Sequence, residues 1–259
     1  MNIFDAIVLG VVEGITEFLP ISSTGHLAVV ADWLGVADLN FLPSFMIAVQ
    51  VGAIMAVVVM YIKSLATSPG LWLRLFIGII PTAIIGVTLY SFIRPLLDNV
   101  IVVGVALIVG GIFMIVVENV VSKRKPIEEN VEPDKYPTVY QSFMIGVYQV
   151  ISFIPGVSRS AVTIMGGLIH RVPRKTVVEF SFLLSVPTMI AAMGYDVLRS
   201  SQTFTADNWY VMAIGGIVAF FVAIVIIRWL LRFIKKYSFK GFGWYRIVAG
   251  IIFFFIMFI

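Results

Sequence analysis

The sequence has 259 residues, of which 60% are hydrophobic and only 12% are charged; this is about half the charged fraction of a typical soluble domain, so a soluble globular protein is excluded. The net charge of +4 comes from basic residues in short segments between apolar runs, and these positions indicate membrane topology rather than a nucleic-acid partner. The sequence contains no cysteine, which excludes disulfides, thiol catalysis and zinc sites built on cysteine.

The first half of the sequence, residues 1–120, predicts one hairpin and three membrane spans. It opens with two short apolar legs, 5–19 and 23–35, which meet at a tip rich in Pro and Ser. Crossing a membrane takes about 20 apolar residues, so these legs are too short to span. We expect a re-entrant hairpin over 5–35, a shape tolerated at membrane depth where protein or a water-filled cavity surrounds it. Full spans follow at about 44–62, 72–91 and 100–118.

A charged linker at 121–136 leads to a second half, 137–259, of the same design. Its short legs, 140–154 and 158–169, predict a second re-entrant hairpin over 140–169. A hairpin with three spans crosses the membrane an odd number of times, so the second half is inverted relative to the first. The predicted fold class is therefore an all-α integral membrane protein with an inverted repeat. The remaining spans are expected at about 177–197, 209–231 and 244–259.

The two hairpins also match residue by residue, which supports an internal duplication. The first reads GVVEGITEFLPISSTGHL from Gly10, and the second reads GVYQVISFIPGVSRSAV from Gly146. With a one-residue offset at Glu17, the matching pairs are Glu13 with Gln149, Pro20 with Pro155, and Ser23 with Ser158.

The basic residues predict the orientation in the membrane. Of the 18 Lys and Arg residues, Arg159 lies in the second hairpin, and Arg94 and Arg199 lie on one side of the layout. All the others, Arg246 and the linker residues among them, fall on the opposite side, which the positive-inside rule assigns to the cytoplasm. We therefore expect a multi-pass protein of the cell membrane, with both termini on the extracytoplasmic side.

Three charged residues in the hairpins, Glu13, Glu17 and Arg159, are too costly at membrane depth to serve packing alone. Each unpaired charge near the bilayer centre costs roughly 3 kcal/mol. Glu13 and Glu17 are four residues apart and share a helix face. We expect the three charges to meet one another, water or an ion. Two simpler interpretations stay open: a shallow first leg that exposes both acids to water, and an Arg159 that only neutralises an acid.

Each hairpin tip predicts an anion site. The first leg ends at a proline, so Ser22 or Ser23 suits an N-cap that leaves the N–H groups of the next turn facing the cavity. Ser158 occupies the same place after the second tip. A helix N-terminus with free N–H groups is a natural phosphate site, and Arg159 can add a bidentate clamp.

Two carboxylates, several hydroxyls, a histidine and an arginine then share one site, which suits phosphate or diphosphate hydrolysis. The carboxylates can hold a divalent cation that bridges phosphate oxygens. A serine needs a base to attack phosphorus, and Glu17 or His26 is the candidate. The attacking group stays open among serine, histidine and water. Simpler roles are His26 as a structural residue, the serines as plain caps, Thr24 and Thr163 as contacts between helices, and Gln149 as an interhelical hydrogen-bond donor.

Three segments carry a likeness to a known family. They are EGITEFLPISSTGH from Glu13, PGVSRSAVTI from Pro155 and FSFLLSVP from Phe180. They resemble the signatures of the undecaprenyl-diphosphate phosphatase family, also known for bacitracin resistance, and the likeness covers nearly the whole sequence. The resemblance implies hydrolysis of undecaprenyl diphosphate to the monophosphate, which recycles the carrier lipid of cell-wall synthesis. It also implies a divalent cation, Mg²⁺ or Ca²⁺, as cofactor.

The resemblance implies roles for individual residues as well. Glu13 and Glu17 fill the acidic motif and would hold the metal. Ser23 resembles the nucleophile or a phosphate ligand, and His26 the acid or base. One position departs from the family pattern, because Ala161 stands where a glycine is usual. The catalytic candidates are Glu17, Ser23, His26 and Arg159, and the substrate-binding candidates are Ser22, Thr24, Ser158, Ser160, Thr163 and Gln149.

We expect the polyprenyl tail to stay in the lipid while the diphosphate enters the pocket between the hairpins from the extracytoplasmic side. A transporter or flippase for a phosphorylated isoprenoid lipid is the alternative, since inverted repeats with broken helices at the midplane are common in transporters. Release of inorganic phosphate from farnesyl diphosphate separates the two. Besides the lipid substrate and the bilayer, a second copy of the chain is a candidate partner, as a homodimer.

Overall fold

A computed structural model of the protein describes residues 1–37, 41–89, 92, 100–124, 136–199 and 209–258. Within these ranges every regular element is a helix and no strand is present. The predicted all-α class is therefore confirmed.

The first half of the chain forms two short helices and then three long ones. The short helices α1 and α2 correspond to the two predicted legs, and the long ones to the three predicted spans. A short helix, α4, was not predicted; it continues the chain after α3 once the backbone turns at Tyr61. The helices are α1 (Ile3–Thr16), α2 (Ser23–Trp33), α3 (Leu42–Met60), α4 (Ile62–Thr67), α5 (Pro69–Thr88) and α7 (Val100–Ser122).

The second half repeats this order. Its first leg begins as an α-helix and ends in one 3₁₀ turn, η1, before the tip. Both first legs start with a capping box, Asn2 with Asp5 and Thr138 with Gln141, in which each side chain bonds the backbone N–H of the other residue. The elements are α8 (Val139–Gln149), η1 (Val150–Phe153), α9 (Arg159–Ile169), α10 (Arg174–Arg199), α11 (Trp209–Phe233) and α12 (Lys240–Phe258).

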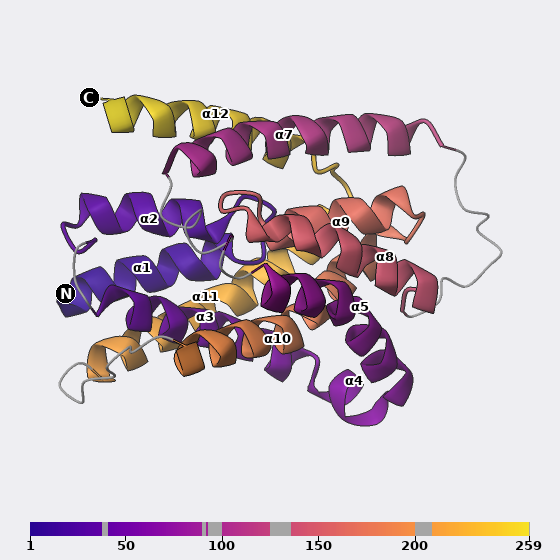
Figure 1. Cartoon of the computed structure of the whole chain (residues 1–259), viewed down its shortest axis with the longest axis horizontal. Coiled ribbons are helices and arrows are strands. Elements are labelled where there is room, and N and C mark those ends of the chain that lie inside the picture. The colour runs from indigo at the N-terminus through magenta and orange to yellow at the C-terminus, as the bar shows by residue number, and fades with distance from the viewer. Residues whose placement is uncertain (38–40, 90–91, 93–99, 125–135, 200–208, 259) are drawn as a thin grey trace.

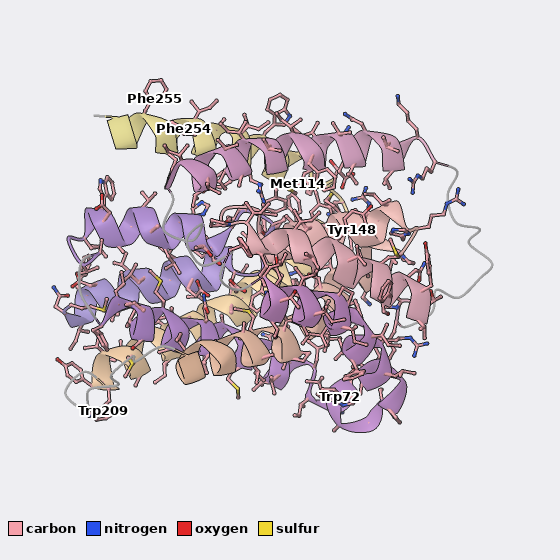
Figure 2. All side chains as sticks on the ribbon, in the orientation of Figure 1. Trp72, Met114, Tyr148, Trp209, Phe254 and Phe255 are labelled. Atoms are coloured by element: carbon pink, nitrogen blue, oxygen red, sulfur yellow. The ribbon has the colours of Figure 1, made fainter. Side chains whose placement is uncertain are left out.

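Five helices within the described ranges are long and apolar enough to cross a membrane. Trp72 and Trp209, both exposed, lie at opposite ends of the helical body, as expected of side chains that anchor at the two membrane surfaces (Figure 2). The protein is therefore a multi-pass membrane protein. The span predicted over 244–259 falls on α12, whose side chains from 256 onward lie outside the described residues. The five segments are Leu42–Met60, Pro69–Thr88, Ile101–Ser122, Arg174–Gly194 and Trp209–Phe233.

The two hairpins approach each other from opposite ends of the molecule (Figure 1). Figure 1 shows α1 and α2 at the left and α8 and α9 at the right, with their tips facing each other near the middle. The tips touch, because the Ser160 hydroxyl on α9 donates to the Leu19 carbonyl in the first tip at 2.9 Å. Helices α7 and α12 pack along each other beside the hairpins (Figure 1). The two chain ends lie at the same end of the view.

Matching helices of the two halves pack in matching ways. Helix α1 packs on α11, and α8 packs on α5. In each crossing two glycines meet: a Cβ added at Gly10 would lie 2.6 Å from the Gly215 carbonyl oxygen, and one at Gly146 would collide with the Gly78 carbonyl. Small residues allow this close approach of helix backbones in membranes. The inverted orientation of the halves and the boundaries between them stay predictions.

Candidate active site

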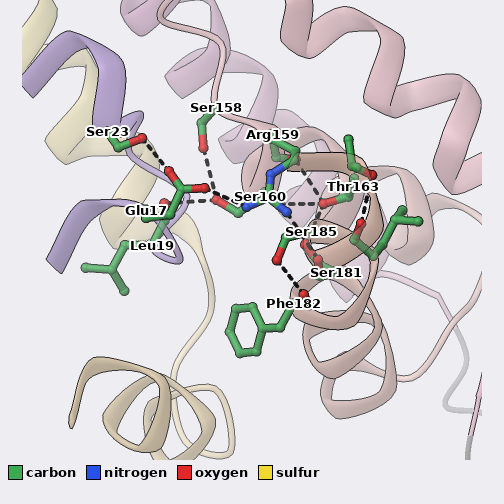
Figure 3. Close-up of polar contacts among 12 residues, drawn as sticks. Glu17, Leu19, Ser23, Ser158, Arg159, Ser160, Thr163, Ser181, Phe182 and Ser185 are labelled. Atoms are coloured by element: carbon green, nitrogen blue, oxygen red, sulfur yellow. Dashed lines mark hydrogen bonds and ion pairs between the residues drawn. The ribbon is translucent and has the colours of Figure 1, made fainter. Parts of the chain in front are cut away.

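The two hairpin tips meet at a buried ion pair. The Arg159 Nη2 atom, from the start of α9, lies 2.7 Å from Oε1 of Glu17, which follows α1. The other carboxylate oxygen, Oε2, accepts a hydrogen bond of 2.6 Å from the Ser23 hydroxyl at the start of α2. Figure 3 shows Glu17 with Ser23 on one side of this cluster and Arg159 on the other. Glu17 is only 8% exposed, so the prediction that the acid and the arginine share one site is confirmed by geometry.

The helix starts that frame this pair share an unusual backbone. Ser22 precedes α2 with φ of 75°, and Ser158 precedes α9 with φ of 72°. This left-handed region is uncommon for residues other than glycine and costs of order 1 kcal/mol or more each. The backbone thus pairs Ser158 with Ser22, so the predicted match with Ser23 is wrong by one residue. Ser23 instead occupies the position of Arg159, and both contact the same carboxylate.

The serines play different parts in capping. The Ser158 hydroxyl accepts from the Ala161 N–H at 3.3 Å and caps α9 as predicted, whereas the Ser22 side chain makes no capping hydrogen bond. Ser158 also shares a hydrogen bond of 3.0 Å with Ser160, which in turn bonds the first tip. Ala161, which departs from the family pattern, is buried in α9.

Thr163 supports Arg159 from one turn further along α9. Its hydroxyl lies 2.9 Å from the Arg159 carbonyl and 2.6 Å from the Ser181 hydroxyl on α10 (Figure 3). The Arg159 Nη1 atom also lies 3.5 Å from the Ser181 carbonyl, a weak contact. Thr163 therefore joins two helices, in agreement with the simpler role that the sequence left open for it.

Glu13 lies one turn before Glu17 and is fully buried, with 0% exposure. Both of its carboxylate oxygens are without a hydrogen-bond partner among the described residues. Burial of Glu13 and Glu17 rules out the alternative of a water-exposed helix face. A buried carboxylate needs a proton, a cation or a donor to offset its desolvation. Two neighbouring carboxylates fit Mg²⁺ or Ca²⁺, which take oxygen ligands and bind through one or two carboxylates together with phosphate oxygens.

His26 makes its two hydrogen bonds to groups outside the ion pair. Its Nδ1 atom lies 2.7 Å from the Ser22 carbonyl, so Nδ1 carries the proton, and its Nε2 atom accepts from the Tyr245 hydroxyl at 2.7 Å. The two rings stack with centroids 5.7 Å apart. Tyr245, on α12, was not predicted to belong to the site. Nothing in the sequence pairs residues 219 positions apart.

Two other predicted substrate-binding residues, Gln149 and Thr24, have different surroundings. The Gln149 amide donates to the Thr82 hydroxyl on α5 at 2.8 Å and to the Thr188 hydroxyl on α10 at 3.3 Å. It therefore links helices, which is the simpler role considered for it. Thr24 is exposed in the first turn of α2.

Arg246 corrects the predicted distribution of basic residues. It was counted in a cytoplasmic cluster, but it lies on α12 with 0% exposure and donates to carbonyls of both hairpin tips and of α7. The charge count misplaced it because an arginine at the edge of an apolar run looks the same in the sequence whether its side chain faces water or the protein interior.

An apolar cavity of about 240 Å³ adjoins the His26–Tyr245 pair. Side chains from α2, α7 and α12 line it, among them Val29, Leu107 and Ile252. The histidine and the tyrosine form its polar end.

Comparison with known proteins agrees with this architecture. The model of the family described as bacitracin resistance protein BacA matches residues 6–252. A protein named undecaprenyl-diphosphatase from Aquifex aeolicus is 45% identical over 254 residues, which cover 98% of each chain. One of the same name from Persephonella marina is 45% identical over 253 residues, again 98% of each chain. The one from Flavobacterium johnsoniae is 40% identical over 97% of this chain and 95% of its own. The match spans both hairpins and all the long helices, and the chain belongs to the bacitracin resistance protein BacA family.

Proposed function

We propose that this protein is a membrane phosphatase that hydrolyses undecaprenyl diphosphate to undecaprenyl monophosphate and inorganic phosphate. The observation that carries the proposal is the buried contact of Glu17 with both Ser23 and Arg159 where the two tips meet. This contact joins an anion-binding group, a hydroxyl and a base within a protein whose relatives bear the name undecaprenyl-diphosphatase. The product returns to cell-wall synthesis as a carrier lipid.

Arg159 binds the diphosphate in this proposal. Its guanidinium exchanges part of its contact with Glu17 for oxygens of the terminal phosphate, where a bidentate contact stabilises the charge of the transition state. The starts of α2 and α9 add the positive ends of two helix dipoles on either side of the same phosphate. Ser158 shapes one of these starts through its hydrogen bond to the Ala161 N–H.

Glu17 acts as the base. The hydrogen bond of 2.6 Å from Ser23 places the serine proton within reach of the carboxylate. The oxygen that loses its proton, from Ser23 or from a water in its place, forms a bond to the terminal phosphorus. The bond from that phosphorus to the bridging oxygen breaks, and the bridging oxygen leaves on undecaprenyl monophosphate. If Ser23 attacks, a water then cleaves the serine phosphate and releases inorganic phosphate.

Glu13 and Glu17 would hold the divalent cation. Mg²⁺ or Ca²⁺ bound there would neutralise charge on the phosphate oxygens. The fully buried carboxylate of Glu13 supports this assignment, because neither of its oxygens has a hydrogen-bond partner among the described residues.

The lipid tail of the substrate occupies the apolar cavity between α2 and α12. The cavity is lined mostly by hydrocarbon side chains together with His26 and Tyr245, and His26 lies on α2, the helix that begins with Ser23. The tail then continues into the lipid, and the diphosphate turns inward to the tips. We assign the opening of the site and both chain termini to the extracytoplasmic side, by the positive-inside rule applied to the remaining basic residues.

The test is phosphate release by the purified protein in detergent, with Mg²⁺ and either farnesyl or undecaprenyl diphosphate. We expect one inorganic phosphate per substrate molecule and a prenyl monophosphate as the second product. Binding of the diphosphate without any phosphate release would favour the transporter or flippase instead, since a transporter has no need to hydrolyse its cargo.

A further inference from the structure

We propose that Arg246 is a positioning residue that holds the two hairpin tips in the register that the reaction requires. The inference rests on the proposed function only for its kinetic readout. Arg246 lies on α12, outside both hairpins and outside the sequence motifs, and its guanidinium reaches the backbone of both tips.

All five N–H donors of the Arg246 guanidinium have a carbonyl acceptor. The Nη1 atom donates to the Pro20 carbonyl of the first tip at 3.2 Å and to the Val157 carbonyl of the second at 2.8 Å. The Nη2 atom donates to Gly156 at 3.0 Å and to Ala106 on α7 at 3.1 Å, and Nε lies 3.4 Å from Leu107. A guanidinium has five such donors and no more. Arg246 therefore has no donor left for a phosphate, which distinguishes it from Arg159.

The surroundings of Arg246 supply carbonyl acceptors and space for its guanidinium. The residue is fully buried, and its partners in the described part of the chain are carbonyl groups and no carboxylate. Arg174, by contrast, pairs with the carboxylate of Glu118 through two hydrogen bonds of 2.6 Å. Gly110 on α7 leaves the space that the guanidinium fills, since an added Cβ there would collide with Nη2. A cation buried without a counter-ion is costly, so packing alone does not account for it.

The bonds of Arg246 fall on the segments that carry the reacting groups. Pro20 lies between Glu17 and Ser23 in the chain, and Val157 directly precedes Ser158 and Arg159. A single nitrogen, Nη1, joins these two segments. The position of the Glu17 carboxylate relative to the Arg159 guanidinium is thereby tied to one planar group. Lysine has three donors on a single atom and cannot make these five directed bonds.

The kinetic test compares the variants Arg246→Lys and Arg246→Gln with the wild type. A misplacement of about 1 Å in a catalytic site lowers the rate about 100-fold, so we expect kcat to fall about 100-fold in both variants while KM changes less than about threefold. The matched control is Lys240→Gln, which removes a positive charge from the start of the same helix and should keep wild-type kcat. Wild-type kcat in Arg246→Lys would overturn the proposal, because charge alone would then suffice.

A spectroscopic test measures the tips directly. The protein has no cysteine, so cysteines introduced at Ala28 on α2 and at Ile154 in the second tip, both exposed, carry the only two spin labels. We expect a narrow distribution of distances between the labels with Arg246 present and a broad or shifted one in Arg246→Gln. An unchanged distribution would overturn the proposal. This readout needs no substrate, so it stands even if the wild type releases no phosphate.

Gly110→Ala provides a second variant that keeps the arginine. Its methyl group displaces the guanidinium without removing the charge, and we expect the same fall in kcat and the same broadening of the label distances. If Arg246→Gln fails to fold in detergent, Gly110→Ala decides alone: kcat and distances equal to those of the wild type would overturn the proposal.

Discussion

Ser23 and Arg159 bind the two oxygens of one carboxylate, that of Glu17, at 2.6 and 2.7 Å. Each is the first residue of its helix, and each follows a serine with a left-handed backbone conformation. The two hairpins therefore present equivalent positions to a single acid, although one position carries a hydroxyl and the other a guanidinium. In the proposed mechanism, Ser23 is the candidate nucleophile at one of these positions and Arg159 the anion-binding group at the other.

Arg159→Ala and Glu17→Gln should each lower phosphate release by about 100- to 1000-fold, the cost of removing a group that stabilises developing charge. The double variant Glu17→Gln/Arg159→Ala should lose less than the product of the two single effects, because the residues act as one pair. Initial rates with farnesyl diphosphate and a thermal melt in detergent measure activity and folding together. Full activity in either folded single variant would refute the assignment of the site.

Glu13→Gln should affect cation binding and leave the other groups of the site in place. Removing a carboxylate ligand should raise the Mg²⁺ concentration for half-maximal activity about tenfold, the scale of a loss of about 1.4 kcal/mol in binding. In EDTA the variant should melt at or above the wild-type temperature, since the carboxylate it removes is buried without a hydrogen-bond partner in the described part of the chain. An unchanged Mg²⁺ dependence would show that Glu13 is not a ligand.

The sequence predicted His26 as an acid or base, and Tyr245→Phe tests that role: it should lower kcat about fivefold. The substitution keeps the ring that stacks on His26 but removes the hydroxyl that donates to Nε2 at 2.7 Å. One hydrogen bond contributes about 1 kcal/mol, and the histidine loses the contact that fixes its orientation. Tyr210→Phe, which removes a hydroxyl from an exposed tyrosine on α11, is the control and should keep wild-type kcat. Equal rates in the two variants would exclude a role for the tyrosine.

Ile252→Trp should raise KM for undecaprenyl diphosphate several-fold. The larger tryptophan side chain fills part of the cavity of about 240 Å³ between α2 and α12, where the lipid tail is proposed to lie. Ile251→Trp is the matched control, because this neighbour is similarly exposed but does not line the cavity. The measurement is the dependence of the initial rate on substrate concentration in mixed micelles. A KM equal in both variants would show that the lipid tail binds at another surface.

Local patterns accounted for much of this protein. The short apolar legs and the turn residues between them predicted two hairpins, and α1, α2, α8 and α9 lie where those legs were placed. The cost of a buried charge predicted that Glu13, Glu17 and Arg159 would meet one another, water or an ion, and Glu17 does meet Arg159, 142 positions away. These predictions succeed because leg length, tip composition and the energetics of burial are properties of a single segment.

The one-residue shift between Ser22 and Ser158 shows where pattern matching stops. Sequence alignment places the two prolines in register, whereas the backbone places the two left-handed residues in register. A tip can contain one extra residue and keep the same kinds of residue, so the sequence alone does not reveal which residue begins the helix.

The amino-acid sequence alone determined the class of protein, the two hairpins and the need of the buried charges for partners, because hydropathy and charge act over short segments. Only the tertiary structure decided that Arg246 is buried between the tips, that Tyr245 holds His26, and that Gln149 belongs to a contact between helices. Each of these contacts depends on which face of a helix meets which neighbour. An arginine that faces water and one that bonds five carbonyls look the same in a sequence.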